Sequence, residues 1–213
     1  SYPGSGITWN NLITPSSTGT LTNGAIYDAA NKGSISVDGI DDYITVPIAN
    51  TITNTFTINI WVKPIANSST GSIGYMGLVQ RFTGTNAGSG QRNRFLLQSG
   101  FNVFYFQAVV AGITYDIASD TFPSIQNQIT MCSVTYNGAS VKFYINGLSV
   151  LASPFALTGN LNTGSSIPYL GWGAASADYY MNGKFYNYQV YNVALTDAQI
   201  LQNYNALKGR FSV

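Results

Sequence analysis

Residues 129–151 read ITMCSVTYNGASVKFYINGLSVL, and this stretch decides the fold class. Two runs of alternating side chains fill it, the first ending at Asn137-Gly138 and the second at Asn146-Gly147. Period-two alternation is typical of β-strands, and Asn-Gly pairs tolerate the positive φ that tight hairpin turns require. The stretch therefore predicts a three-stranded antiparallel meander.

The same alternation recurs along the chain. From Thr55 to Lys63 apolar side chains occupy every second position, which predicts a half-buried strand that Pro64 should end. Turn residues separate most of the other predicted strands. These strands are Gly33–Val37, Tyr43–Val46, Gly77–Phe82, Arg94–Gln98, Asn102–Val110, Ile113–Ile117 and Lys184–Tyr191.

A helical pattern occurs at the C-terminal end, over Leu195–Gly209. Thr196 is the predicted N-cap, and Gln199 completes a capping box. The apolar face of this helix should comprise Ile200, Leu201, Tyr204 and Leu207. Many strands, one terminal helix and no linker-like run predict a single all-β domain over residues 1–213, an antiparallel β-sandwich of the jelly-roll type.

Charge is scarce in this sequence. Charged residues make up 8% and the net charge is +1, which argues against nucleic acid as a partner. No apolar run approaches the ~18 residues of a membrane-spanning helix, so membrane insertion is not expected. The surface must instead carry Ser, Thr, Asn and Tyr, which suit neutral, hydroxyl-rich ligands. The single cysteine, Cys132, is predicted to be a small buried residue rather than a reactive thiol.

The sequence contains no histidine and no glutamate, and its eight acidic residues are all aspartates. Histidine is the one side chain whose unperturbed pKa lies near neutral pH, so the usual general base is missing. A single aspartate with a shifted pKa could still act as a base. The composition therefore predicts a binding protein rather than an enzyme.

Several motifs, in order and spacing, resemble the laminin-G-like, concanavalin A-like lectin/glucanase superfamily, in the form found in secreted bacterial and phage virion proteins. They are YPGSG at 2–6 with Trp9, SVDGIDDYI at 36–44, FTINIWVKP at 56–64, TYNG at 135–138 through YING at 144–147, GKF at 183–185, YNVALT at 191–196 and QNYNALKGRF at 202–211. The resemblance implies two curved antiparallel sheets, a concave face that often binds glycans and sometimes a nearby calcium ion. It also implies that Trp61 belongs to the core. Glucanases of the superfamily use a glutamate pair, which this chain lacks.

Asp38, Asp41 and Asp42 place three carboxylates within five residues at a predicted turn. Together with backbone carbonyls they could hold a hard cation such as Ca²⁺. The alternative is that Asp38 and Asp41 hydrogen-bond to their own turn, as Asx residues commonly do.

Two loop regions carry candidate ligand-binding residues. Arg92 and Arg94 follow a glycine-rich loop at 84–90, where their guanidinium groups could bind the carboxylates of an acidic sugar or a partner, or simply pair with aspartates. Trp172 lies between glycines, with Tyr179 and Tyr180 shortly after it. Exposed aromatic rings stack on the apolar faces of sugars, although Trp172 could equally anchor its loop. If these loops meet at one rim of the concave sheet, they form one aromatic platform edged by cations.

These residues favour a non-catalytic, lectin-like module on a virion surface or outside the cell, which attaches a larger assembly to a glycan. Two alternatives remain open at this point. One is a structural or assembly protein that contacts other virion or cell-surface proteins, since tyrosine is also enriched in protein interfaces. The other is an unusual hydrolase.

Overall fold

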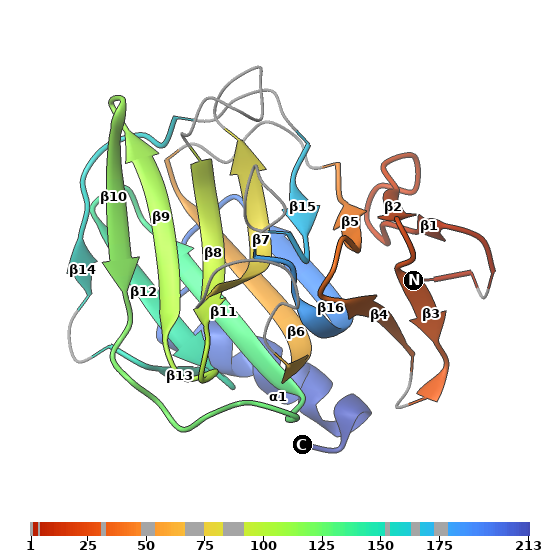
Figure 1. Ribbon diagram of the computed structural model, residues 1–213. Coiled ribbons are helices and arrows are strands. Elements are labelled where there is room, and N and C mark those ends of the chain that lie inside the picture. Colours follow the sequence, from red (N-terminus) through yellow and green to blue (C-terminus); the bar gives the residue numbers. More distant parts are fainter. Residues whose placement is uncertain are drawn as a thin grey trace.

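A computed structural model describes residues 2–3, 5–30, 33–47, 54–66, 75–82, 92–151, 154–162, 167–172 and 179–213, with the side chains of residues 80–82 and 92 left out. The described strands form two antiparallel sheets of eight strands each, packed face to face (Figure 1). The architecture is the predicted concanavalin A-like β-sandwich with one C-terminal helix.

The order of strands in each sheet is not the order of the sequence. The first sheet contains β1 (Thr8–Trp9), β2 (Gly19–Thr22), β5 (Tyr43–Thr45), β15 (Tyr169–Leu170), β7 (Tyr75–Phe82), β8 (Arg92–Gln98), β9 (Phe104–Val110) and β10 (Ile113–Ala118). The second contains β13 (Leu148–Ser149), β12 (Ser140–Ile145), β11 (Thr130–Tyr136), β6 (Phe56–Ala66), β16 (Asn182–Tyr191), β4 (Ser34–Asp38) and β3 (Ile26–Asp28), with β14 (Phe155–Ala156) paired to β12.

The predicted meander is present as β11, β12 and β13, but its two turns differ. Asn146 and Gly147 both have positive φ, 49° and 85°, and they form the two-residue turn between Ile145 and Leu148. At the first turn only Gly138 has positive φ. Asn137 contributes its side chain instead, because its Oδ1 accepts the backbone N–H groups of residues 139 and 140.

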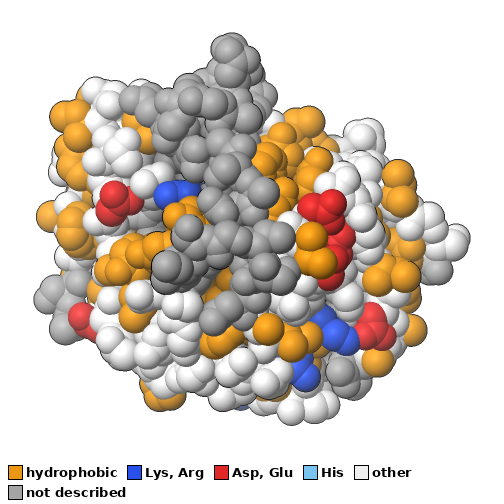
Figure 2. Space-filling view, viewed as in Figure 1, with side chains coloured by type: hydrophobic (Ala, Val, Ile, Leu, Met, Phe, Trp, Pro, Cys, Tyr) orange, Lys and Arg blue, Asp and Glu red, His pale blue; other side chains and the backbone are white. Residues whose placement is uncertain are grey.

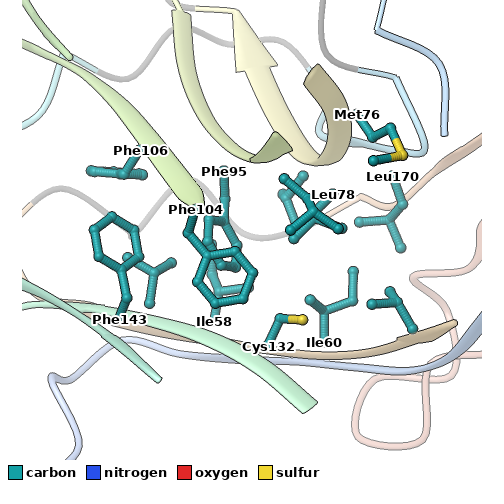
Figure 3. Close-up of a cluster of buried hydrophobic side chains, with 14 of the residues drawn as sticks. Ile58, Ile60, Met76, Leu78, Phe95, Phe104, Phe106, Cys132, Phe143 and Leu170 are labelled. Carbon is teal, nitrogen blue, oxygen red and sulfur yellow. The ribbon is translucent and has the colours of Figure 1, made fainter. Parts of the chain in front are cut away.

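The hydrophobic core fills the space between the two sheets. Figure 3 shows Phe95, Phe104 and Leu170 from the first sheet facing Ile58, Ile60 and other side chains of the second. Cys132 lies in this core and is fully buried, as predicted. Burial without a polar partner raises the pKa of its thiol far above the usual range, so the group stays neutral.

Strand β6 differs from its prediction in two ways. It was predicted to be half-buried, yet both of its faces are buried from Phe56 to Val62 because a second layer covers the side away from the core. It was also predicted to end at Pro64, but it continues to Ala66. Pro64 lies opposite Gly183 of β16, next to a register shift, and such an irregularity tolerates a residue that lacks an N–H group.

The second layer is helix α1 (Asp197–Phe211), which packs on the outer side of the second sheet. Thr196 and Gln199 form the predicted capping box. The helix does not end at Gly209, as predicted, but continues to Phe211, whose ring lies 4.7 Å from that of Trp61. Trp61 is fully buried and stacks on Tyr204 at 5.6 Å. Within the described residues, no helix has both the length and the apolar character needed to span a membrane.

Leu201 is a further difference from the predicted helix face. Its side chain is 37% exposed, whereas Ile200 is fully buried in the cluster around Trp61. The buried face of the helix is therefore centred on Ile200 and not on Leu201. Ile200 packs in one cluster with Trp61, Met131 and Tyr144 of the sheet. Leu201 lies at its margin, against the turn at Gly147.

We predict that Ile200→Ala lowers the free energy of unfolding by about 2–5 kcal/mol, the usual cost of truncating a fully buried aliphatic side chain. Leu201→Ala is the matched control and should cost less than about 1 kcal/mol because its side chain is already partly solvated. Urea unfolding of both variants measures the difference. Equal losses would show that the helix docks through a different face.

Candidate functional site

The outer face of the first sheet carries a row of polar side chains. Ile44, Leu170, Val79, Phe95 and Phe106 are cross-strand partners that face the core, so their neighbours along each strand face outward. The register aligns these outward neighbours across the six strands from β5 to β10. Those with described side chains are Thr45, Tyr169, Arg94, Gln107 and Asp116.

Four aromatic rings gather beside this row, near β5 and β15. Trp172 follows β15, and its ring lies 5.6 Å from that of Tyr43 and 5.0 Å from that of Tyr169, edge to face with the latter. Tyr180 stacks on Trp172 at 6.0 Å with the planes only 8° apart. Tyr180 is just 8% exposed, while the other three rings are half-buried. Burial favours a supporting role for Tyr180, which backs Trp172. We call these four residues the tryptophan cluster.

A second aromatic group, the tyrosine cluster, consists of Tyr75, Tyr105 and Tyr179. The ring of Tyr75 lies 4.8 Å from that of Tyr105 and 5.6 Å from that of Tyr179, edge to face with both. The guanidinium of Arg94 lies over the Tyr179 ring, 5.2 Å from its centroid, a cation–π geometry. Gln107 donates to Asp116 at 2.7 Å beside this group.

Tyr179 has a φ of 65°, in the left-handed region that a bulky residue rarely adopts. Its carbonyl accepts the N–H of Gly77, and the N–H of Met181 donates to Gly171, so hydrogen bonds hold this conformation in place. The two consecutive tyrosines thereby contact different clusters, Tyr179 the ring of Tyr75 and Tyr180 the ring of Trp172. Backbone strain of this kind is typical of ligand sites.

The phenol groups of Tyr75, Tyr169 and Tyr180 remain neutral at physiological pH. Burial raises the pKa of Tyr75 to about 12, and hydrogen bonding to Tyr105 adds to the effect. Burial also raises the pKa of Tyr169 and of Tyr180. A neutral phenol both donates and accepts, so it can bind hydroxyl groups in either sense.

The three aspartates predicted as a metal site form a compact group at the β4–β5 turn. Asp38, Asp41 and Asp42 each offer a carboxylate oxygen within 4.8 Å of the others, and acidic side chains gather beside β4 and β5 in Figure 2. The turn also uses them internally, because Asp38 Oδ1 accepts the N–H of Ile40 at 2.8 Å and Asp42 Oδ2 accepts the N–H of Asp38 at 3.0 Å. The Asx geometry predicted for Asp38 is therefore present.

Asp42 nevertheless has an unsatisfied acceptor. Its side chain is 4% exposed, and its buried Oδ1 has no hydrogen-bond partner. Burial raises the pKa of Asp42, and the negative charges of Asp38 and Asp41 act in the same direction. An unpaired buried carboxylate oxygen beside two exposed carboxylates fits the donor set of a hard cation. These three residues would hold it, and its charge would offset their repulsion.

Of the residues predicted from the sequence, the structure thus brings Trp172 together with Tyr180, and Tyr179 together with Arg94, in two separate clusters. Arg92 lies at the start of β8, but its side chain and the loop at 84–90 fall outside the described residues. Sequence reasoning missed Tyr43, Tyr75, Tyr105 and Tyr169. Alternation alone could have placed Tyr43 and Tyr105 on the outward face of their strands, since each follows or precedes a core residue.

The fold and motifs agree with a family profile, described as the concanavalin A-like lectin/glucanases superfamily, that matches residues 38–201. The chain belongs to this superfamily. A sequence comparison with curated proteins finds no match. Solved structures show a similar fold at low sequence identity.

Two of the similar structures are toxin binding domains. The binding domain of botulinum neurotoxin serotype G has a TM-score of 0.68 and 11% identity, over 90% of this chain and 47% of that one. The binding domain of Paraclostridial Mosquitocidal Protein 1 has a TM-score of 0.70 and 16% identity, over 92% of this chain and 49% of that one. The chain therefore spans about half the length of these two domains.

The third is domain 4 of AbnA, a GH43 extracellular arabinanase from Geobacillus stearothermophilus, in complex with arabinotriose. Its TM-score is 0.60 at 20% identity, over 86% of both chains. This similarity covers the same share of both chains and shows a shared fold.

Calcium at the Asp38–Asp42 turn stays a prediction, and thermal unfolding tests it. A cation that binds only the folded state stabilises by mass action, so calcium about a hundredfold above its Kd should raise the Tm by roughly 5–10 °C relative to EDTA. Asp42→Asn should abolish the shift, whereas the control Asp116→Asn on β10 should retain it. A Tm that is the same in calcium and EDTA would contradict the prediction.

Proposed function

We propose that this domain is a non-catalytic glycan-binding module whose ligand lies on the outer face of the first sheet. The observation that carries the proposal is the tryptophan cluster, with Trp172 half-buried among Tyr43 and Tyr169 and backed by Tyr180. Aromatic rings stack on the apolar C–H faces of sugars, and rings already held by their neighbours lose little entropy on binding.

The polar row supplies the other half of sugar recognition. Thr45, Gln107 and the neutral phenol of Tyr169 present donors and acceptors next to the rings. Among the side chains that Figure 2 colours by type on this face, hydrophobic and uncharged polar ones predominate over charged ones. Such a face suits a neutral or weakly charged carbohydrate. Arg94, whose guanidinium lies over the Tyr179 ring, offers a cationic contact for an acidic sugar.

The absence of catalysis is part of the same proposal. Glycoside hydrolysis normally requires two carboxyl groups on opposite sides of the scissile bond. The chain has no glutamate, and within the described part of the chain the aspartates that cluster do so at the β4–β5 turn, where Asp42 is buried. The similar structures, two toxin binding domains and an arabinanase domain in complex with arabinotriose, support a binding role.

The proposal includes a place of action, on a virion surface or outside the cell, where the domain attaches a larger assembly to a polysaccharide. Support comes from the resemblance to secreted and phage virion proteins. The alternative is an assembly protein that acts through protein–protein contacts. Leu12 and Ile13 favour that alternative because they are 74% and 91% exposed next to β1.

A screen of immobilised polysaccharides tests the first function. On a glycan that binds, Trp172→Ala should weaken affinity about tenfold, the loss of roughly 1.4 kcal/mol expected for one stacked aromatic contact. The control is Phe155→Ala, which removes a 40% exposed ring from β14 of the other sheet and should leave affinity unchanged. Equal effects of the two variants would show that the glycan binds at a different surface. Binding of a native partner protein but of no glycan would favour the assembly role.

Incubation with the same polysaccharides should release no reducing ends at any pH, because the chain has no glutamate or histidine and the aspartates that cluster lie within one turn, with Asp42 buried. A reducing-sugar assay with long incubation measures this. Activity that disappears when one aspartate is replaced by asparagine would overturn the non-catalytic assignment.

A further inference from the structure

The two aromatic clusters lie along one line across the first sheet. Tyr43 on β5 belongs to the tryptophan cluster and Tyr105 on β9 to the tyrosine cluster. Four interstrand steps, β5 to β15 to β7 to β8 to β9, separate them, which at about 4.8 Å each corresponds to roughly 19 Å.

A series of contacts between aromatic rings extends across most of this distance. Tyr43 contacts Trp172 and Trp172 contacts Tyr180. The next residue in this line is Tyr179, the chain neighbour of Tyr180, and it contacts Tyr75, which in turn contacts Tyr105. The positive φ of Tyr179 is what directs the two consecutive rings to different clusters. The strained backbone therefore links the two halves of the line.

The polar row runs parallel to the aromatic line. Cross-strand partners lie perpendicular to the strands, so Tyr169, Arg94, Gln107 and Asp116 follow the same direction as the rings. On β9 one core-facing residue, Phe106, separates Gln107 of the polar row from Tyr105 of the aromatic line, whereas Tyr169 of β15 belongs to both. A ligand lying across the strands meets rings on one side and hydrogen-bonding groups on the other.

From this arrangement we infer that the site is elongated and binds a stretch of a linear glycan, several sugar units long, which runs across strands β5 to β9. A sugar ring is about the size of the aromatic ring on which it stacks, so a monosaccharide covers one cluster at most. The tyrosine cluster is then a second subsite, with Tyr105 at its far end. The inference rests on the proposed glycan-binding function and specifies the ligand's length and direction.

Titration with oligosaccharides of increasing length tests the inference. The probes are linear arabino-, xylo-, cello- and chito-oligosaccharides, from the monosaccharide to the octasaccharide. For a series that binds, affinity should rise with length until both clusters are covered and then level off. Tyr105→Ala should lower affinity for the hexasaccharide about tenfold and change affinity for the disaccharide less than about twofold. Trp172→Ala should lower affinity at every length.

Tyr105→Leu is a second variant, because it keeps an apolar side chain in the strand and removes only the ring, and both variants are checked by their Tm. Equal affinity of the parent for the disaccharide and the hexasaccharide would overturn the elongated site. An equal loss at all lengths, or no loss, in folded Tyr105 variants would do the same. If no series and no polysaccharide binds, the glycan-binding function itself fails, and the inference fails with it.

Discussion

The burial of β6 on both faces is the constraint on which the rest of the structure depends. Its core side, with Ile58 and Ile60, faces the first sheet, and its opposite side, with Trp61, faces helix α1. Each face excludes water only while its covering layer stays in place, and burial of apolar surface is the main stabilising term in folding. The helix thus covers the outer face of the second sheet around Trp61. The aromatic clusters of the candidate site lie on the opposite side of the sandwich, on the outer face of the first sheet.

Much of the fold could be predicted because the relevant signals are local. The alternation in 129–151 identified three strands, and Thr196 with Gln199 located the start of the helix. Errors arose where a distant contact overrides the local signal. Pro64 did not end its strand because a register shift against Gly183 accommodates it. Leu201 was assigned to the buried face because periodicity fixes a stripe only to within about one residue, and Trp61 decides which residue it centres on.

The candidate site was only partly predictable for a similar reason. Loop composition indicated Trp172, Tyr179 and Tyr180, since glycine-flanked aromatics stand out in sequence. It could not indicate that β15, only two residues long, lies between β5 and β7 and brings Tyr43 beside Trp172. Strand order in a sandwich follows from long-range pairing that alternation does not encode. Ligand contact at these residues stays a prediction.

The pairing of β6 also bears on the order in which the chain can fold. Its neighbours are β11 and β16, so Ile60 pairs with Cys132 on one side and with Tyr188 on the other. Strand β11 is part of the local meander, whereas β16 is the last strand before the helix. During synthesis, the edge of β6 that pairs with β16 therefore has no partner until residues 182–191 are available. The face that carries Trp61 stays uncovered until the helix, residues 197–211, has been made. Contacts so distant in sequence slow folding, and the exposed edge is one to which another chain could pair in the meantime.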